Sequence, residues 1–215
     1  MQREGAPAFQ AEFARPYALH FRGNRFAAAL LRLAGWRLAF DGLPAQQGVL
    51  AVYPHTSNWD TVVLLAAKVA TGAPMKFLSK ASLFRIPLFG RYLRWMGGIP
   101  VDRAAPGKVT LQVIGGMTQA KAQGRCYWLT LTPEGTRAYT PGLRSGFYRI
   151  AREAGVPLGL VRLDYGRREI VVGPFMHVTG DREADMAFVR RAFEGATALH
   201  PKQASPLVLL DGGRE

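Results

Sequence analysis

Short apolar runs alternate with longer helical patterns along most of this chain, and the alternation constrains the fold more than any other feature. Residues 48–53 (GVLAVY) form a continuous apolar run of strand length, and residues 58–70 have the spacing of a helix. Further strands are expected at 75–79, 98–101, 126–132, 158–164 and 169–172, and further helices at 86–96, 109–123, 143–154 and 181–199. Strands separated by helices favour a single α/β domain with a mostly parallel sheet flanked by helices.

The two ends of the chain depart from this alternation. Residues 1–37 are predicted to form an N-terminal arm and an amphipathic helix, residues 38–200 the α/β domain, and residues 201–215 a loose tail. Residues 20–36 combine a helical stripe of apolar side chains with basic ones: Phe21, Phe26, Leu30, Leu33 and Trp36, with Arg22, Arg25 and Arg32. Such a helix is typical of a membrane interface, and an ordinary surface helix packed on the domain has a similar pattern.

The charge of the chain indicates a polyanionic partner. It carries 28 basic and 15 acidic residues, a net charge of +13. Composition alone leaves nucleic acid, an anionic membrane surface and an acidic carrier protein as partners. Because the basic residues are spread along the chain and form no recognised nucleic-acid module, we expect no nucleic acid among the partners.

No apolar run reaches the roughly 18 residues of a membrane-spanning helix, and the first residues lack the apolar core of a signal peptide. The chain is therefore expected to stay on the side of the membrane where it is made. Its one cysteine, Cys126, excludes an internal disulfide framework and is expected to be a buried, unreactive thiol within a strand.

Sites in open α/β sheets gather beyond the carboxyl ends of the strands. The strand ending at Tyr53 leads into His55 and Asp60, which would face different sides of one continuous helix. They can meet if His55 lies in the loop and Asp60 in the first turn of the next helix. The carboxylate would then fix the imidazole tautomer and leave the other ring nitrogen free as a base. The alternative is a capping box of Ser57 and Asp60, with His55 as a polar loop residue.

A second strand end leads into PEGTR, residues 133–137. Gly135 would let the backbone approach an anion closely, and Thr136 and Arg137 would donate to phosphate; the alternative is an ordinary turn. Arg103 follows a third extended segment and could reach the same pocket, or form a surface ion pair with Asp102.

Other chemistries lack their motifs in this sequence. It contains no GxSxG nucleophile elbow, no HExxH or similar histidine spacing, and neither a Walker A nor a GxGxxG loop. We therefore predict no metal site and no bound cofactor.

Four segments occur in order: HTSNWD (55–60), GGIPVDR (97–103), PEGTR (133–137) and AGVPLGLVRLD (154–164). Together they resemble the four motif blocks of the glycerolipid acyltransferase family, whose bacterial members include the 1-acylglycerol-3-phosphate acyltransferases. The resemblance implies that His55 is the general base and Asp60 its orienting carboxylate. It implies acceptor binding by Arg103, Glu134, Gly135, Thr136 and Arg137, and by Lys80 through a looser match. Ala138 departs from the serine that the family often has there.

The resemblance further implies an acyltransferase of phospholipid biosynthesis. It would move a fatty acyl group from acyl-CoA or an acyl carrier protein, as co-substrate, to a hydroxyl of a lysophospholipid such as 1-acylglycerol-3-phosphate. The enzyme is expected at the cytoplasmic face of the inner membrane, peripheral or monotopic, attached through residues 20–36. The alternatives are an aminolipid or glycolipid acceptor, or a non-catalytic basic module that binds membranes.

Overall fold

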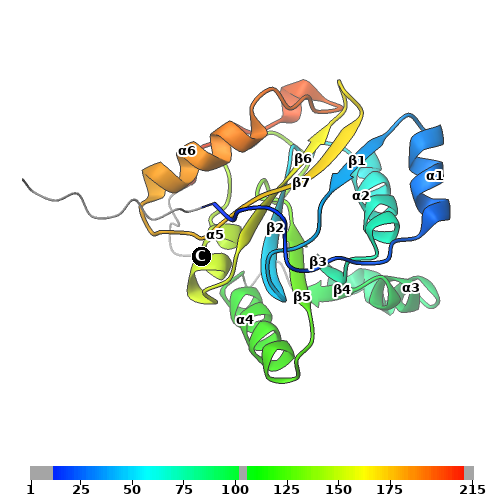
Figure 1. Ribbon diagram of the computed structural model, residues 1–215, viewed down its shortest axis with the longest axis horizontal. Coiled ribbons are helices and arrows are strands. Elements are labelled where there is room, and N and C mark those ends of the chain that lie inside the picture. Colours follow the sequence, from blue (N-terminus) through cyan, green and yellow to red (C-terminus); the bar gives the residue numbers. More distant parts are fainter. Residues whose placement is uncertain (1–11, 102–105, 211–215) are drawn as a thin grey trace, which may run out of the picture.

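The computed structural model of the chain describes residues 12–101 and 106–210. The elements in chain order are α1 (Arg25–Leu33), β1 (Arg37–Phe40), β2 (Gln47–Tyr53), α2 (Asn58–Thr71), β3 (Met75–Lys80), the 3-10 helix η1 (Ala81–Arg85), α3 (Phe89–Trp95), β4 (Gly98–Val101), α4 (Pro106–Ala122), β5 (Tyr127–Leu131), α5 (Gly146–Glu153), β6 (Leu158–Asp164), β7 (Glu169–Met176), α6 (Arg182–Phe193) and the 3-10 helix η2 (Pro201–Gln203). The strands form one sheet in the order β1-β7-β6-β2-β5-β3-β4 (Figure 1). All neighbours are parallel except β6 and β7, which form an antiparallel hairpin.

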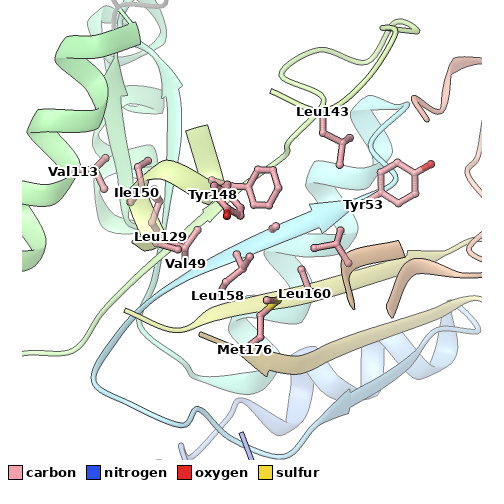
Figure 2. Close-up of a cluster of buried hydrophobic side chains, with 14 of the residues drawn as sticks. Val49, Tyr53, Val113, Leu129, Leu143, Tyr148, Ile150, Leu158, Leu160 and Met176 are labelled. Carbon is pink, nitrogen blue, oxygen red and sulfur yellow. The ribbon is translucent and has the colours of Figure 1, made fainter. Parts of the chain in front are cut away.

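Strand β2 lies at the centre of the sheet and is buried along its whole length. Its successive side chains point to opposite faces, as in any strand. Val49 and Ala51 join a cluster that includes side chains of α4, α5 and α6, whereas Leu50 and Val52 join one that includes side chains of α1 and α2. Figure 2 shows part of the first cluster. Because helices cover both faces of β2, all of its side chains are buried, which explains its continuous apolar run. The mostly parallel sheet flanked by helices confirms the predicted α/β domain.

The strands and helices predicted within residues 48–199 are present, with differences at their ends. Strand β7 continues to Met176, and α6 already ends at Phe193. The helix expected over 86–96 is shorter, because a turn at Leu88 separates η1 from α3. Strand β1 is not predicted from the sequence, because its apolar stretch, Leu38–Phe40, is shorter than the runs of four or more residues that indicate a strand.

The N-terminal helix is only partly available to a membrane. Trp36 is buried, and Phe21 packs against the same apolar cluster of the domain. The expectation that these two side chains insert into a membrane is therefore wrong. Three side chains of the predicted stripe are exposed on α1: Phe26, Leu30 and Leu33. Across residues 12–101 and 106–210, the structure contains no helix with the length and apolar character needed to span a bilayer.

The expected loose tail is wrong for residues 201–210. The N–H of Leu143 donates to the carbonyl of Val208, and the N–H of Leu210 donates back to the carbonyl of Leu143. The hydroxyl of Tyr53 donates to the carbonyl of Ser205 at 2.8 Å. This C-terminal segment is thus fixed to the end of β2 and to the chain that follows β5.

Candidate active site

Four neighbouring parallel strands bring the predicted site residues to one edge of the sheet. In the spatial order β2, β5, β3, β4, the carboxyl ends lead to His55, to PEGTR, to Lys80 and to the segment that contains Arg103. Adjacent strands are separated by about 4.8 Å, so the first and last of these ends are about 14 Å apart. Lys80 is exposed at its strand end, and Arg103 lies outside the described residues.

The loop after β2 brings His55 against Asp60. His55 Nδ1 is 3.1 Å from Asp60 Oδ2, with His55 in the loop and Asp60 in the first turn of α2. The ring is not aligned for a straight N–H···O bond; the short distance nevertheless defines the pair, because such catalytic bonds often tighten only in the substrate complex. With Nδ1 facing the carboxylate, Nε2 is the ring nitrogen that can take a proton.

Asp60 also caps its own helix, so the capping box and the contact with His55 occur together. The side chain of Ser57 accepts the N–H of Trp59 at 3.1 Å, and Oδ2 of Asp60 accepts the N–H of Ser57 at 2.9 Å, which completes a capping box. The same oxygen accepts the N–H of Thr56 at 2.7 Å. The helix start therefore fixes the carboxylate that faces the histidine.

Asp60 remains ionised despite its burial. Burial alone would raise the pKa of Asp60, and it is the largest single influence. The opposing contacts outweigh it and lower the pKa of Asp60; they are the nearby His55 ring, the hydroxyl of Tyr165 and the backbone N–H groups of Ser57 and Thr56. An anion held in this way can orient the imidazole and stabilise it once it has taken a proton.

Glu134 is predicted to bind the acceptor, but its side chain is buried behind the histidine loop. Its side chain is fully buried, and its two oxygens accept the N–H of His55 at 2.6 Å and the N–H of Ser205 at 3.1 Å. Burial raises the pKa of Glu134, although these backbone hydrogen bonds partly offset the effect. The carboxylate therefore ties the histidine loop to the C-terminal segment and is not open to an acceptor.

Residues 135–137 of PEGTR are accessible, whereas Pro133 is buried. Gly135 has φ +68°, and a Cβ there would lie 2.7 Å from Cδ of Arg144, so the Arg144 side chain covers this glycine. Arg137 and Arg144 are exposed, and Thr136 is half-buried. The turn that follows β5 therefore carries one exposed arginine, Arg137, and has the side chain of a second, Arg144, against it.

Two further residues of the site are not found from the sequence. The hydroxyl of Tyr165 donates to Oδ1 of Asp60 at 2.7 Å. Tyr165 comes directly after β6, the strand beside β2, and this position next to a strand end is the one signal that could have indicated it. The N–H of Ser205 reaches Glu134 from a region without any motif, so no sequence signal indicates it.

Comparisons with known proteins agree with this geometry. A sequence model of the Acyltransferase family matches residues 39–161, more than half of the chain. A 1-acyl-sn-glycerol-3-phosphate acyltransferase of Pseudomonas aeruginosa is 27% identical over 207 residues, which cover 85% of this chain and 76% of that protein. A probable 1-acyl-sn-glycerol-3-phosphate acyltransferase 5 of Arabidopsis thaliana is 30% identical over 121 residues, 55% of this chain and 32% of that protein.

A solved structure shares the fold. The crystal structure of the 1-acyl-sn-glycerophosphate acyltransferase PlsC from Thermotoga maritima aligns with a TM-score of 0.51 and 20% identity, over 79% of this chain and 74% of that one. The match to the family over residues 39–161 includes both His55 and Asp60. The chain therefore belongs to the glycerolipid acyltransferase family, and it is an acyltransferase.

Proposed function

We propose that the enzyme acylates the free hydroxyl of 1-acylglycerol-3-phosphate, with acyl-CoA or an acyl carrier protein as donor, in phospholipid biosynthesis. The observation that carries this proposal is the His55–Asp60 pair beside the arginines of the neighbouring strand end. A base next to cationic side chains suits an acceptor that bears both a hydroxyl and a phosphate. Two relatives are named for this acceptor, which supports the same substrate class here.

The chemistry is a direct transfer. Nε2 of His55 takes the proton of the acceptor hydroxyl as that oxygen attacks the carbonyl carbon of the thioester. The C–S bond of the tetrahedral intermediate then breaks, and His55 returns the proton to the departing thiolate. Asp60 holds the opposite ring nitrogen and offsets the imidazolium charge. No covalent acyl-enzyme is needed.

Cys126 has no part in this chemistry. It is a free, half-buried thiol that precedes β5, so it lies at the opposite end of that strand from PEGTR. Burial raises the pKa of the Cys126 thiol and so disfavours the reactive thiolate.

The acceptor phosphate is assigned to the cationic side of the site. Arg137 and Arg144 lie on the chain that follows β5, and Lys80 ends the next strand. Thr136 and the backbone at Gly135 are further donors, and Arg103 follows the strand beyond Lys80. Glu134 does not contact the phosphate in this proposal; it positions His55 by accepting its backbone N–H.

A lipid acceptor requires access to a membrane, and we infer peripheral attachment at the cytoplasmic face of the inner membrane. On α1, the exposed Phe26, Leu30 and Leu33 accompany the exposed Arg25 and Arg32. Apolar side chains beside basic ones suit an anionic interface.

The test is consumption of acyl-CoA with 1-acylglycerol-3-phosphate, compared between the wild type and His55→Ala. Loss of a general base should lower turnover by about 10²–10⁴-fold. Near-normal turnover by a folded His55→Ala protein would contradict the mechanism. Arg103→Ala and Arg137→Ala should raise the acceptor KM more than the donor KM, by about tenfold or more. A preference for a lyso-aminolipid or a lyso-glycolipid in the same assay would instead assign that acceptor.

A further inference from the structure

An exposed apolar surface lies on the segment between β3 and β4. The part of the chain that the structure describes has fourteen exposed large hydrophobic side chains, and five of them fall within residues 86–95. These are Ile86, Leu88, Phe89, Tyr92 and Trp95, here called the 86–95 surface. Figure 1 shows α3 at the rim of the fold, beyond β4. Single exposed apolar residues are normal, whereas a contiguous group indicates an interaction site.

The aromatic part of this surface cannot turn inward. Phe89, Tyr92 and Trp95 follow one another at helical spacing, with ring centroids 6.4 and 6.1 Å apart along the outside of α3. The inward side of the helix is filled by Leu93 and by Gly90, where a Cβ would lie 2.3 Å from the carbonyl of Phe84. The helix is therefore packed on one side, and the aromatic row faces outward.

The backbone at the tip of the surface is strained. Leu88 has φ +62° and ψ −51°, and the N–H of Phe89 donates to the carbonyl of Pro87 at 2.6 Å. These angles define a γ-turn with positive φ, which is rare because it strains the backbone of any residue that has a side chain. Glycine would adopt it more easily. The turn nevertheless carries a leucine, and its side chain is 77% exposed. An apolar residue held outward at such a position contributes little to the protein's own core.

The charge around the surface selects the partner. No Asp or Glu occurs between residues 61 and 101, a stretch that contains six basic residues: Lys68, Lys76, Lys80, Arg85, Arg91 and Arg94. Arg94 lies over the ring of Phe84, whereas Arg85 and Arg91 are exposed and form no ion pair with any described residue. Aromatic and aliphatic side chains with a cationic rim complement an anionic lipid surface.

We propose that the 86–95 surface docks on an anionic bilayer, with Leu88, Phe89 and Trp95 in the headgroup region and Arg85 and Arg91 at the level of the phosphates. The 86–95 surface follows η1, which begins directly after Lys80 at the same edge of the sheet as His55, and α3 then leads back to the start of β4. A bilayer held there would present the lipid acceptor to that edge. The inference rests on the proposed lipid substrate. It adds a second membrane contact to the one proposed for α1.

The test is flotation of the full chain with phosphatidylglycerol vesicles and with phosphatidylcholine vesicles. The surface variant is Leu88→Gly with Phe89→Ser and Trp95→Ser. The matched control is Leu111→Ser with Val208→Ser, which removes exposed apolar side chains from other parts of the fold. We expect the surface variant to bind phosphatidylglycerol vesicles at least about tenfold more weakly than the wild type, and the control to bind like the wild type. Leu88→Gly alone should not lower the thermal midpoint, because glycine relieves the positive φ.

The outcomes separate the candidate partners. Equal flotation of the surface variant and the wild type, or an equal loss in the control, would overturn the proposal. Unchanged flotation with lower turnover only when an acyl carrier protein is the donor would assign the surface to that protein instead. The variant Phe26→Ser with Leu33→Ser measures the separate contribution of α1.

Flotation does not depend on catalysis, so the two proposals can fail independently. Turnover of a short-chain, monomeric 1-acylglycerol-3-phosphate tests the proposed function without a bilayer, and the surface variant should retain it. A wild type that floats but does not acylate this substrate would refute the proposed acceptor and leave the docking surface in place. A wild type that acylates it while the surface variant still floats fully would refute only the docking surface.

Discussion

The hydroxyl of Tyr165 donates to Oδ1 of Asp60 at 2.7 Å, while Oδ2 of the same carboxylate faces His55. The carboxylate is thus held at both oxygens and cannot rotate away from the imidazole. The ring of Tyr165 packs edge-on against Trp36, with centroids 5.0 Å apart. Burial first, and then the contact with Asp60, raise the pKa of Tyr165, so it stays a donor throughout the physiological range.

Tyr165→Phe should therefore lower kcat by about tenfold to a hundredfold, since a hydrogen bond to a charged group is worth about 1.5–3 kcal/mol. Without this donor the carboxylate is more basic and attracts the imidazolium more strongly. The acid limb of the kcat/KM pH profile should consequently move to higher pH. The measurement is turnover against pH at saturating donor.

A second buried pair supplies the control. The hydroxyl of Tyr148 donates to Oδ2 of Asp185 at 2.8 Å between α5 and α6, and burial, followed by this contact, raises the pKa of Tyr148 to about 12. Tyr148→Phe removes the same bond elsewhere and should cost similar stability without moving the pH profile. If both variants change activity and profile alike, Tyr165 acts only through stability.

Two carboxylates of the site should give opposite pH dependences of stability. The pKa of Asp60 is lowered, so between that value and about 3.9 the unfolded chain binds more protons and stability rises with pH. The pKa of Glu134 is raised by burial, so above about 4.3 the folded protein binds more protons and stability falls as pH rises toward the folded value. Each slope is at most about 1.4 kcal/mol per pH unit.

Urea unfolding between pH 3 and 7 measures this difference. The stability that the wild type has over Asp60→Asn should shrink as the pH falls below about 4. The difference between the wild type and Glu134→Gln should instead shrink as the pH rises. Parallel slopes for the two variants would contradict these assignments.

Glu134→Gln should also lower activity, although the side chain does not face the site. The amide has one acceptor oxygen, so its NH2 group would confront the N–H of either His55 or Ser205. We expect a loss of about 1–3 kcal/mol of stability and a lower kcat, since His55 loses its support. Ser205→Ala keeps the backbone N–H and should have the smaller effect on kcat; an equal effect would indicate loosening of the C-terminal segment alone.

The sequence predicts those parts of the molecule that depend on neighbouring residues. The apolar run of β2 and the capping box at Ser57 involve few consecutive positions, so the loop that brings His55 to Asp60 follows from them. The end of β2 at Tyr53 and the N-cap at Ser57 together fix the course of the loop between them. With that loop fixed, a spacing of five residues is enough to bring His55 to Asp60.

The parts that sequence reasoning missed depend on contacts between distant segments. Strand β1 exists because Arg37 pairs with Glu169 on β7, and the C-terminal segment is ordered by Glu134 and Leu143. In neither segment is the apolar pattern long enough to indicate its place in the fold. The burial of Glu134 also depends on the C-terminal segment that covers it. The sequence therefore predicts that Glu134 binds substrate, whereas in the structure it accepts the backbone N–H groups of His55 and Ser205.

The last prediction concerns Gly135, whose φ of +68° and missing side chain leave room for Arg144. Gly135→Ala would place a Cβ 2.7 Å from Cδ and Nε of Arg144 and push this arginine away from the turn. Gly124→Ala is the matched control, because its φ is +61° and nothing lies within 4 Å of the added Cβ. Both variants should lose about 1–2 kcal/mol to backbone strain.

Only Gly135→Ala should raise the acceptor KM, by an amount close to that of Arg144→Ala, while the donor KM stays constant. Kinetics with both substrates varied, together with thermal unfolding of all three variants, give the comparison. If Gly124→Ala raises the acceptor KM as much, strain alone explains the effect. If Arg144→Ala leaves the acceptor KM unchanged, the phosphate does not bind over Gly135, and the cationic contact must come from Arg137 or from the ends of β3 and β4.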